Sequence, residues 1–141
     1  MADDGSEVLG VGALFSFQGR INRGTFWKLI VLMIVGIVAA GVLAAVLIPQ
    51  FMTPGAAAGA EAASGGGGTA ALVVIIAIYA VTIWISLATQ VKRWHDMDRS
   101  GWFVLLSLIP AINLLVFLYL GFNPGSAGPN RFGAAPVRIL M

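Results

Sequence analysis

The residues best suited to chemistry lie in one short charged segment between two apolar stretches. Residues 92–101 read Lys-Arg-Trp-His-Asp-Met-Asp-Arg-Ser-Gly and hold the single histidine, His95, beside Asp96 and Asp98. A histidine next to a carboxylate can act as a general base or supply part of a metal site. A catalytic zinc site, however, generally needs three protein ligands, and the adjacent cations repel a metal ion.

The same segment also fits a purely structural role, which we favour. Its Lys and Arg side chains offer the two carboxylates charge-assisted hydrogen bonds. We therefore expect Asp96 and Asp98 to pair with arginines and to cap a helix that begins near Gly101. A membrane enzyme that uses His95 and Asp96 is the less favoured alternative, and we predict that the protein is not an enzyme.

Basic side chains before the first apolar stretch form one cationic set with those of the charged segment. Arginine presents a planar fork of donors that suits phosphate groups, and each basic residue near an anionic membrane surface contributes about 1 kcal/mol of attraction. The set could contact anionic headgroups, or it could serve only to orient the chain in the membrane. Its members are Arg20, Arg23, Lys28, Lys92, Arg93 and Arg99.

The composition indicates that these residues belong to a membrane protein. Of 141 residues, 59% are hydrophobic and 10% charged, and the mean hydropathy is +0.94. Ordinary soluble domains are about 45–50% apolar and about 25% charged. The absence of cysteine excludes disulfides and thiolate chemistry, and no phosphate-binding loop or zinc-protease motif is present. We predict no cofactor, no metal and no nucleic-acid partner.

Three apolar stretches are long enough to be considered as membrane spans. Residues 29–48, 70–91 and 102–121 carry no charged side chain, and Asn22 is suited to cap the first helix. At 1.5 Å per residue, about 20 helical residues cross the hydrocarbon core of roughly 30 Å. The sequence thus predicts an all-α integral membrane protein with about three transmembrane helices.

Proline and glycine mark the breaks between and within these stretches. Pro49 is expected to end the first helix, and residues 50–69 to form a flexible Gly/Ala-rich loop. Pro110 interrupts the third stretch, which is either one kinked span or a re-entrant hairpin; its length favours the span. The sequence thus divides into an N-terminal lead (residues 1–18), a membrane domain (residues 19–136) and a C-terminal tail (residues 137–141).

The distribution of Lys and Arg predicts the orientation. The six members of the cationic set flank the first two spans on one side, whereas the loop of residues 50–69 has none. The positive-inside rule then places the N-terminus and the charged segment in the cytoplasm. Arg131 and Arg138 fit this rule only if the third stretch re-enters. Three tryptophans at span ends are typical of an interfacial belt: Trp27, Trp94 and Trp102.

Two groups within the spans are suited to helix packing. A polar stripe on the second span could line a water-filled path, although such residues more often bond to a neighbouring helix, here to Asn113. Small residues four apart on the first span permit close helix approach. The polar stripe consists of Tyr79, Thr82, Ser86, Thr89 and Gln90, and the small residues are Gly36, Ala40 and Ala44.

Four motifs, in order along residues 14 to 136, resemble the bacterial inner-membrane family known as domain of unknown function 805. That resemblance implies a small multi-span protein of the cytoplasmic membrane and no agreed activity. Gly24 and Thr25 depart from the charged residues usual in the family. The motifs are Phe17-x-Gly19-Arg20-x-x-Arg23-x-x-Phe26-Trp27, Arg93-x-His95-Asp96-x-Asp98-Arg99-Ser100-Gly101-Trp102, Leu108-Ile109-Pro110 and Pro124-Gly125-x-x-Gly128-x-Asn130-Arg131-Phe132-Gly133.

Taken together, the sequence predicts a non-enzymatic scaffold or assembly protein of the inner membrane. Its basic face would contact anionic lipid headgroups or a partner protein, and a homo-oligomer is a further expected form of association. A small-molecule transporter or channel component that uses the polar stripe is the alternative. The residues expected to make the contact are Arg20, Arg23, Arg93, His95, Asp96, Asp98, Arg99, Asn130 and Arg131.

Overall fold

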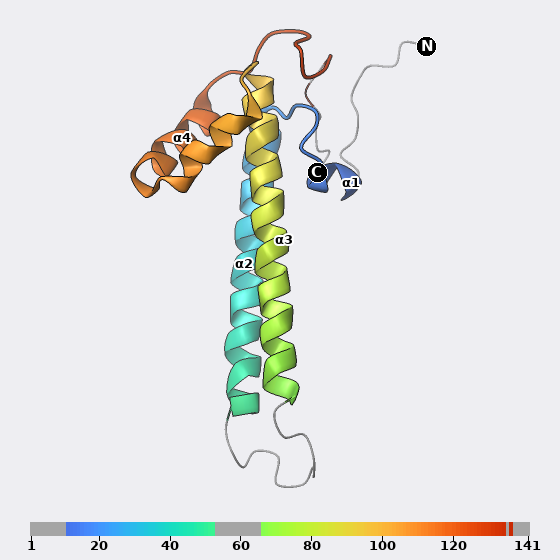
Figure 1. Cartoon of the computed structure of the whole chain (residues 1–141), viewed down its shortest axis with the longest axis vertical. Coiled ribbons are helices and arrows are strands. Elements are labelled where there is room, and N and C mark those ends of the chain that lie inside the picture. The colour runs from blue at the N-terminus through green and yellow to red at the C-terminus, as the bar shows by residue number, and fades with distance from the viewer. Residues whose placement is uncertain (1–10, 53–65, 135, 137–141) are drawn as a thin grey trace. The chain divides into compact units, whose positions relative to one another are not determined.

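The computed structural model describes residues 11–52, 66–134 and 136, and these residues are helical without a named strand (Figure 1). The expected all-α class is confirmed for them. The tail of residues 137–141 and the centre of the expected loop lie outside the described residues. The elements are α1 (Val11–Phe15), α2 (Arg23–Met52), α3 (Gly66–Asp96), the 3-10 helix η1 (Gly101–Leu108) and α4 (Pro110–Phe122).

The chain forms two compact units, which we name by their composition. The apolar unit is residues 32–83, and it contains most of α2 and of α3. The charged unit is residues 1–31 and 84–141, and it contains the remaining elements together with the start of α2 and the end of α3. Each unit is described by itself below.

In the apolar unit, Val, Leu and Ile side chains are exposed along both helices. Two stretches that begin or end beyond this unit, Arg23–Val46 of α2 and Leu72–Asp96 of α3, are long and apolar enough to cross a membrane. Outward-facing aliphatic side chains are what a lipid solvent requires. The two helices therefore contain the first two expected spans.

The first helix does not end at Pro49, which lies inside α2 and is followed by three more helical residues. Proline removes one backbone donor, and one lost bond in the last turn does not stop this helix. Of the small residues expected to pack, Ala40 and Ala44 are half-buried. Gly36 faces open space, since no atom lies within 4 Å of where its Cβ would be.

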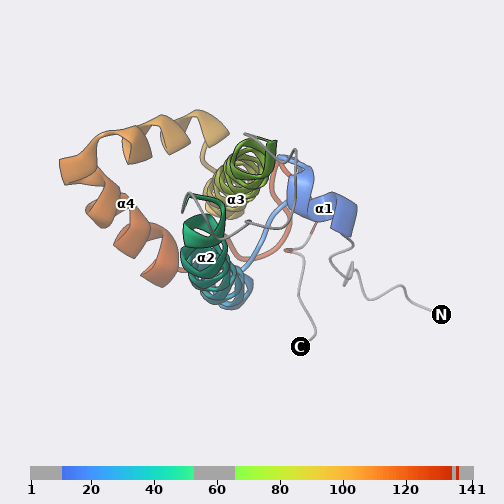
Figure 2. The same cartoon turned by 90° about the horizontal axis from the view of Figure 1, so that it is seen from below.

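The third apolar stretch is divided into two short helices rather than forming one continuous helix. Ile109 is extended, with φ −90° and ψ 110°, between η1 and α4, and Pro110 occupies the first turn of α4. Proline disfavours helical backbone at the preceding residue while fitting the first turn of a new helix. Figure 2 shows the chain running outward along η1 and returning along α4. The 13 residues of α4 are too few to cross a bilayer.

Candidate functional site

A buried group of three charges, Arg20, Arg93 and Asp96, lies at the centre of the charged unit. Arg20 donates from Nε and Nη2 to Asp96 Oδ1 at 3.2 and 3.1 Å. Arg93 Nη1 lies 2.5 Å from Asp96 Oδ2. The three residues are 1%, 0% and 2% exposed. The expected pairing of Asp96 with arginine is confirmed, and both carboxylate oxygens are engaged.

The remaining donors of the two arginines hold the last turn of α4 and the chain that follows it. Arg20 Nη1 donates to the carbonyls of Gly128 and Gly133 at 2.8 and 3.0 Å. Arg93 donates from Nε to Leu120 O at 2.7 Å and from Nη2 to Asn123 O. These carbonyls supply the negative partial charge that one carboxylate alone does not provide for two buried cations.

Ser126 and Asn130 tie the same segment to the end of α3. The Ser126 amide and hydroxyl both donate to Asp96 O, at 2.7 and 2.8 Å. Asn130 Nδ2 donates to His95 O at 2.8 Å. Carbonyls in the last turn of a helix lack hydrogen-bond donors within that helix. Ser126 and Asn130 supply these donors to Asp96 O and His95 O. Sequence reasoning missed Ser126, whose only signal is its place between Gly125 and Gly128.

The α3 helix ends in a two-bond cap with Asp98 in the left-handed region, at φ 56°. Arg99 N donates to Trp94 O and Asp98 N to His95 O, the pattern of a Schellman cap. Arg131 pairs with Asp98 at 3.3 Å and donates to its carbonyl. Asp98 therefore pairs with an arginine as expected.

The helix that starts at Gly101 is capped by Ser100 rather than by a carboxylate. The Ser100 hydroxyl accepts from Trp102 N, while Asp96 and Asp98 are engaged by arginines. The cap expected at Asn22 is confirmed, because its Oδ1 accepts from Thr25 N at 2.7 Å.

The predicted cationic set is split by burial into two groups of three. Lys92 is 5% exposed and donates to Ala13 O, so it joins Arg20 and Arg93 as a structural group. Buried, internally bonded side chains cannot reach a headgroup, so the contact expected at Arg20, Arg93 and Asp96 is not available in this fold. The exposed members are Arg23, Lys28 and Arg99.

The three tryptophans expected at the membrane interface differ in environment. Trp94 is only 6% exposed and packs against Phe103 and Tyr119, so it is not a belt residue. Trp27 is half-buried and donates from Nε1 to Gly121 O at 3.0 Å. Trp102 is 78% exposed.

The polar stripe of α3 is bonded mainly within its own helix. Thr82 and Thr89 donate to the carbonyls four residues earlier. Gln90 contacts Ser86, and its Oε1 accepts from Ser107 of η1 at 2.6 Å. Asn113 is exposed, so Ser107 provides the link that was expected from Asn113.

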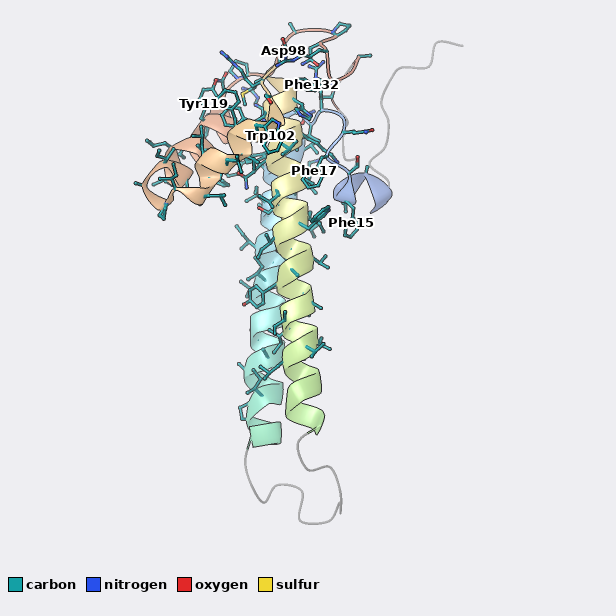
Figure 3. All side chains as sticks on the ribbon, in the orientation of Figure 1. Phe15, Phe17, Asp98, Trp102, Tyr119 and Phe132 are labelled. Carbon is teal, nitrogen blue, oxygen red and sulfur yellow. The ribbon has the colours of Figure 1, made fainter. Side chains whose placement is uncertain are left out.

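His95 is held on two sides. Its ring stacks on Phe132, with centroids 3.9 Å apart and planes 5° apart, and Nδ1 lies 3.3 Å from Gly19 O. The ring also lines a pocket of about 500 Å³ between Phe17 and Trp102. In Figure 3 the labelled Phe17, Trp102 and Phe132 lie around this end of α3.

Comparison with known proteins agrees with this architecture. A family described as "Protein of unknown function (DUF805)" matches residues 14–134. The inner membrane protein YhaH of Escherichia coli (strain K12) is 32% identical over 121 residues, which cover 85% of this chain and 86% of that protein. The inner membrane protein YhaI of the same strain is 44% identical over 50 residues, which cover 36% and 42%. No solved structure matches the chain.

Proposed function

The chain belongs to the DUF805 family, and from this premise we propose that it is a non-enzymatic scaffold of the bacterial inner membrane whose exposed arginines contact anionic lipid headgroups. One observation carries the proposal. The buried charged groups, Arg20, Arg93 and Asp96, bond to one another and to their own chain, and the arginines that remain accessible lie on the surface of the charged unit.

The engagement of Asp96 supports a non-enzymatic role. A general base must come within hydrogen-bond reach of the proton that it removes. Asp96 is 2% exposed and holds two arginines. The Nδ1 of His95 contacts a backbone carbonyl rather than a carboxylate, so His95 lacks the carboxylate partner of a His-Asp pair. Neither residue activates the other, because Asp96 makes its bonds to Arg20 and Arg93.

The accessible arginines support headgroup contact. Arg23 begins α2, Arg99 follows the cap of α3, and Arg131 lies beside Asp98. All three are exposed, and all three belong to the charged unit. A guanidinium near the membrane surface attracts phosphate both by charge and by its paired donors.

We further infer that the chain crosses the membrane twice and that the third apolar stretch, residues 102–121, enters and leaves the membrane at the same face. The residues after α4 are bonded to Asp96 and His95 at the end of α3, and η1 starts from that same end. Both ends of the third segment would therefore lie at one membrane face, in the cytoplasm. All eight Lys and Arg residues lie outside residues 29–91, so this topology satisfies the positive-inside rule, whereas three spans would leave Arg131 and Arg138 outside.

The headgroup contact is tested by native mass spectrometry of the full chain released from membranes in mild detergent. We expect the double variant R23Q/R99Q to retain several-fold less phosphatidylglycerol than the wild type, with phosphatidylethanolamine retention unchanged. The variant R23K/R99K keeps the charge and serves as the matched control, with only a partial loss. Equal retention by R23Q/R99Q and the wild type would overturn the proposal. Loss of a co-purified protein instead of lipid would assign the surface to a protein partner.

A further inference from the structure

The pocket beside His95 is built from four separate parts of the charged unit. Phe17 precedes α2, His95 lies in the last turn of α3, Trp102 in the first turn of η1, and Phe132 after α4. Val91 and Val104 complete the apolar wall. Its volume of about 500 Å³ falls within the roughly 300–1,000 Å³ usual for small-molecule sites.

The imidazole of His95 presents one defined polar atom to this pocket. The Gly19 carbonyl can only accept, so the Nδ1 that contacts it must carry the proton. In the neutral ring Nε2 is then an acceptor. The described residues provide no hydrogen bond to Nε2.

Gly101 leaves this acceptor uncovered. A Cβ at Gly101 would lie 3.0 Å from His95 Nε2 and 2.7 Å from Val91 Cγ1. Any larger residue at this position would therefore press on the imidazole and on the pocket wall. The small residue next to the Ser100 cap thus keeps the pocket open at its polar atom.

The lining defines the kind of ligand. Among the residues that the structure describes, His95 is the one ionisable side chain that lines the pocket, which disfavours a phosphate or a carboxylate. Aromatic rings pack planar partners in edge or offset contacts, and three Phe or Trp rings border this space. Two polar side chains line the pocket, His95 and Ser100. The Ser100 oxygen already accepts from Trp102 N, so His95 Nε2 is the open acceptor, and a ligand that uses it must donate.

We propose that this pocket binds an uncharged aromatic alcohol, with its ring packed between Phe17 and Trp102 and its hydroxyl donating to His95 Nε2. The proposal is independent of the headgroup contact, because Arg23, Arg99 and Arg131 do not line the pocket.

The test titrates the full chain in detergent with 2-naphthol and with 2-methoxynaphthalene, which has the same rings but cannot donate. Calorimetric heats are corrected by titrations of protein-free detergent. For the wild type we expect at least tenfold tighter binding of 2-naphthol. The variant H95F keeps a ring against Phe132 but loses the acceptor, and we expect it to bind both probes equally weakly.

Two further variants keep the outcome decisive if H95F unfolds. G101A retains His95 but covers Nε2, and it should lose the preference for 2-naphthol. N113A alters an exposed side chain of α4 outside the pocket and should bind like the wild type. Equal affinity of the wild type for the two probes, no measurable binding of 2-naphthol, or an unchanged preference in G101A would overturn the proposal.

Discussion

At the scale of single residues, Asp96 and Asp98 show how position decides what a carboxylate does. They are two residues apart, yet Asp96 has a side chain 3% exposed between two arginines, whereas that of Asp98 is 52% exposed with one. A buried ion pair that loses one partner leaves an uncompensated charge. An exposed pair is screened by water and is worth little.

We expect D96N to lower the free energy of unfolding by about 3–5 kcal/mol, because two buried guanidinium groups lose their counter-charge. D98N should change it by less than about 1 kcal/mol, since the pair is exposed and asparagine tolerates the left-handed backbone. Denaturant unfolding in detergent micelles, followed by tryptophan fluorescence, measures both. Similar losses in the two variants would contradict the assignment of Asp96 as the central anion.

At the scale of elements, α2 and α4 meet where Trp27 approaches Gly121. The indole Nε1 donates to Gly121 O, and a Cβ at Gly121 would lie 2.6 Å from Trp27 Cζ2. Phe117 and Phe122 of α4 also contact the Trp27 ring edge-on. A glycine is required here because the bulky ring rests directly on the helix backbone.

We expect G121A to destabilise the protein by about 1–3 kcal/mol, the usual cost of overpacking, through displacement of Trp27. G36A is the matched control, since Gly36 is also helical but faces open space, and it should gain up to about 1 kcal/mol from helix propensity. Thermal unfolding in one detergent compares the pair. A stabilising effect of G121A would show that this contact does not hold α4.

At the scale of the whole molecule, the charged unit draws together segments that are distant in sequence. Arg20, Asp96 and Ser126 come from before α2, the end of α3 and the chain beyond α4. The hydrogen bonds of this group require the residues after α4 to return to the end of α3. The topology of the third segment is therefore linked to the burial of two arginines.

Thiol labelling checks this topology, and the cysteine-free chain gives a clean background. A single cysteine at the exposed Ala127 should resist a membrane-impermeant maleimide in intact cells and react after the membrane is opened. A cysteine at Ser64, in the predicted loop between the first two spans, should react in intact cells. Labelling of A127C from outside would favour three spans and contradict the re-entrant segment.

Several features of this protein follow from the sequence alone, because they depend on local or compositional properties. The excess of apolar residues requires a lipid solvent. The two long helices were predictable because each contains an uninterrupted apolar stretch of sufficient length. Asn22 caps its helix because its side chain reaches a backbone amide three residues on. The pairing of Asp96 with arginine was predictable from the surplus of nearby cations.

Only the tertiary structure decided which of these charges are buried. Arg20 and Arg93 look like surface cations in the sequence, where nothing distinguishes them from Arg23 and Arg99. Their burial depends on carbonyl oxygens of residues more than 25 positions away, and such partners have no local sequence signal. The same contacts between distant segments bring Phe17, Trp102 and Phe132 close to His95. A pocket therefore forms where the sequence predicted only a charged loop.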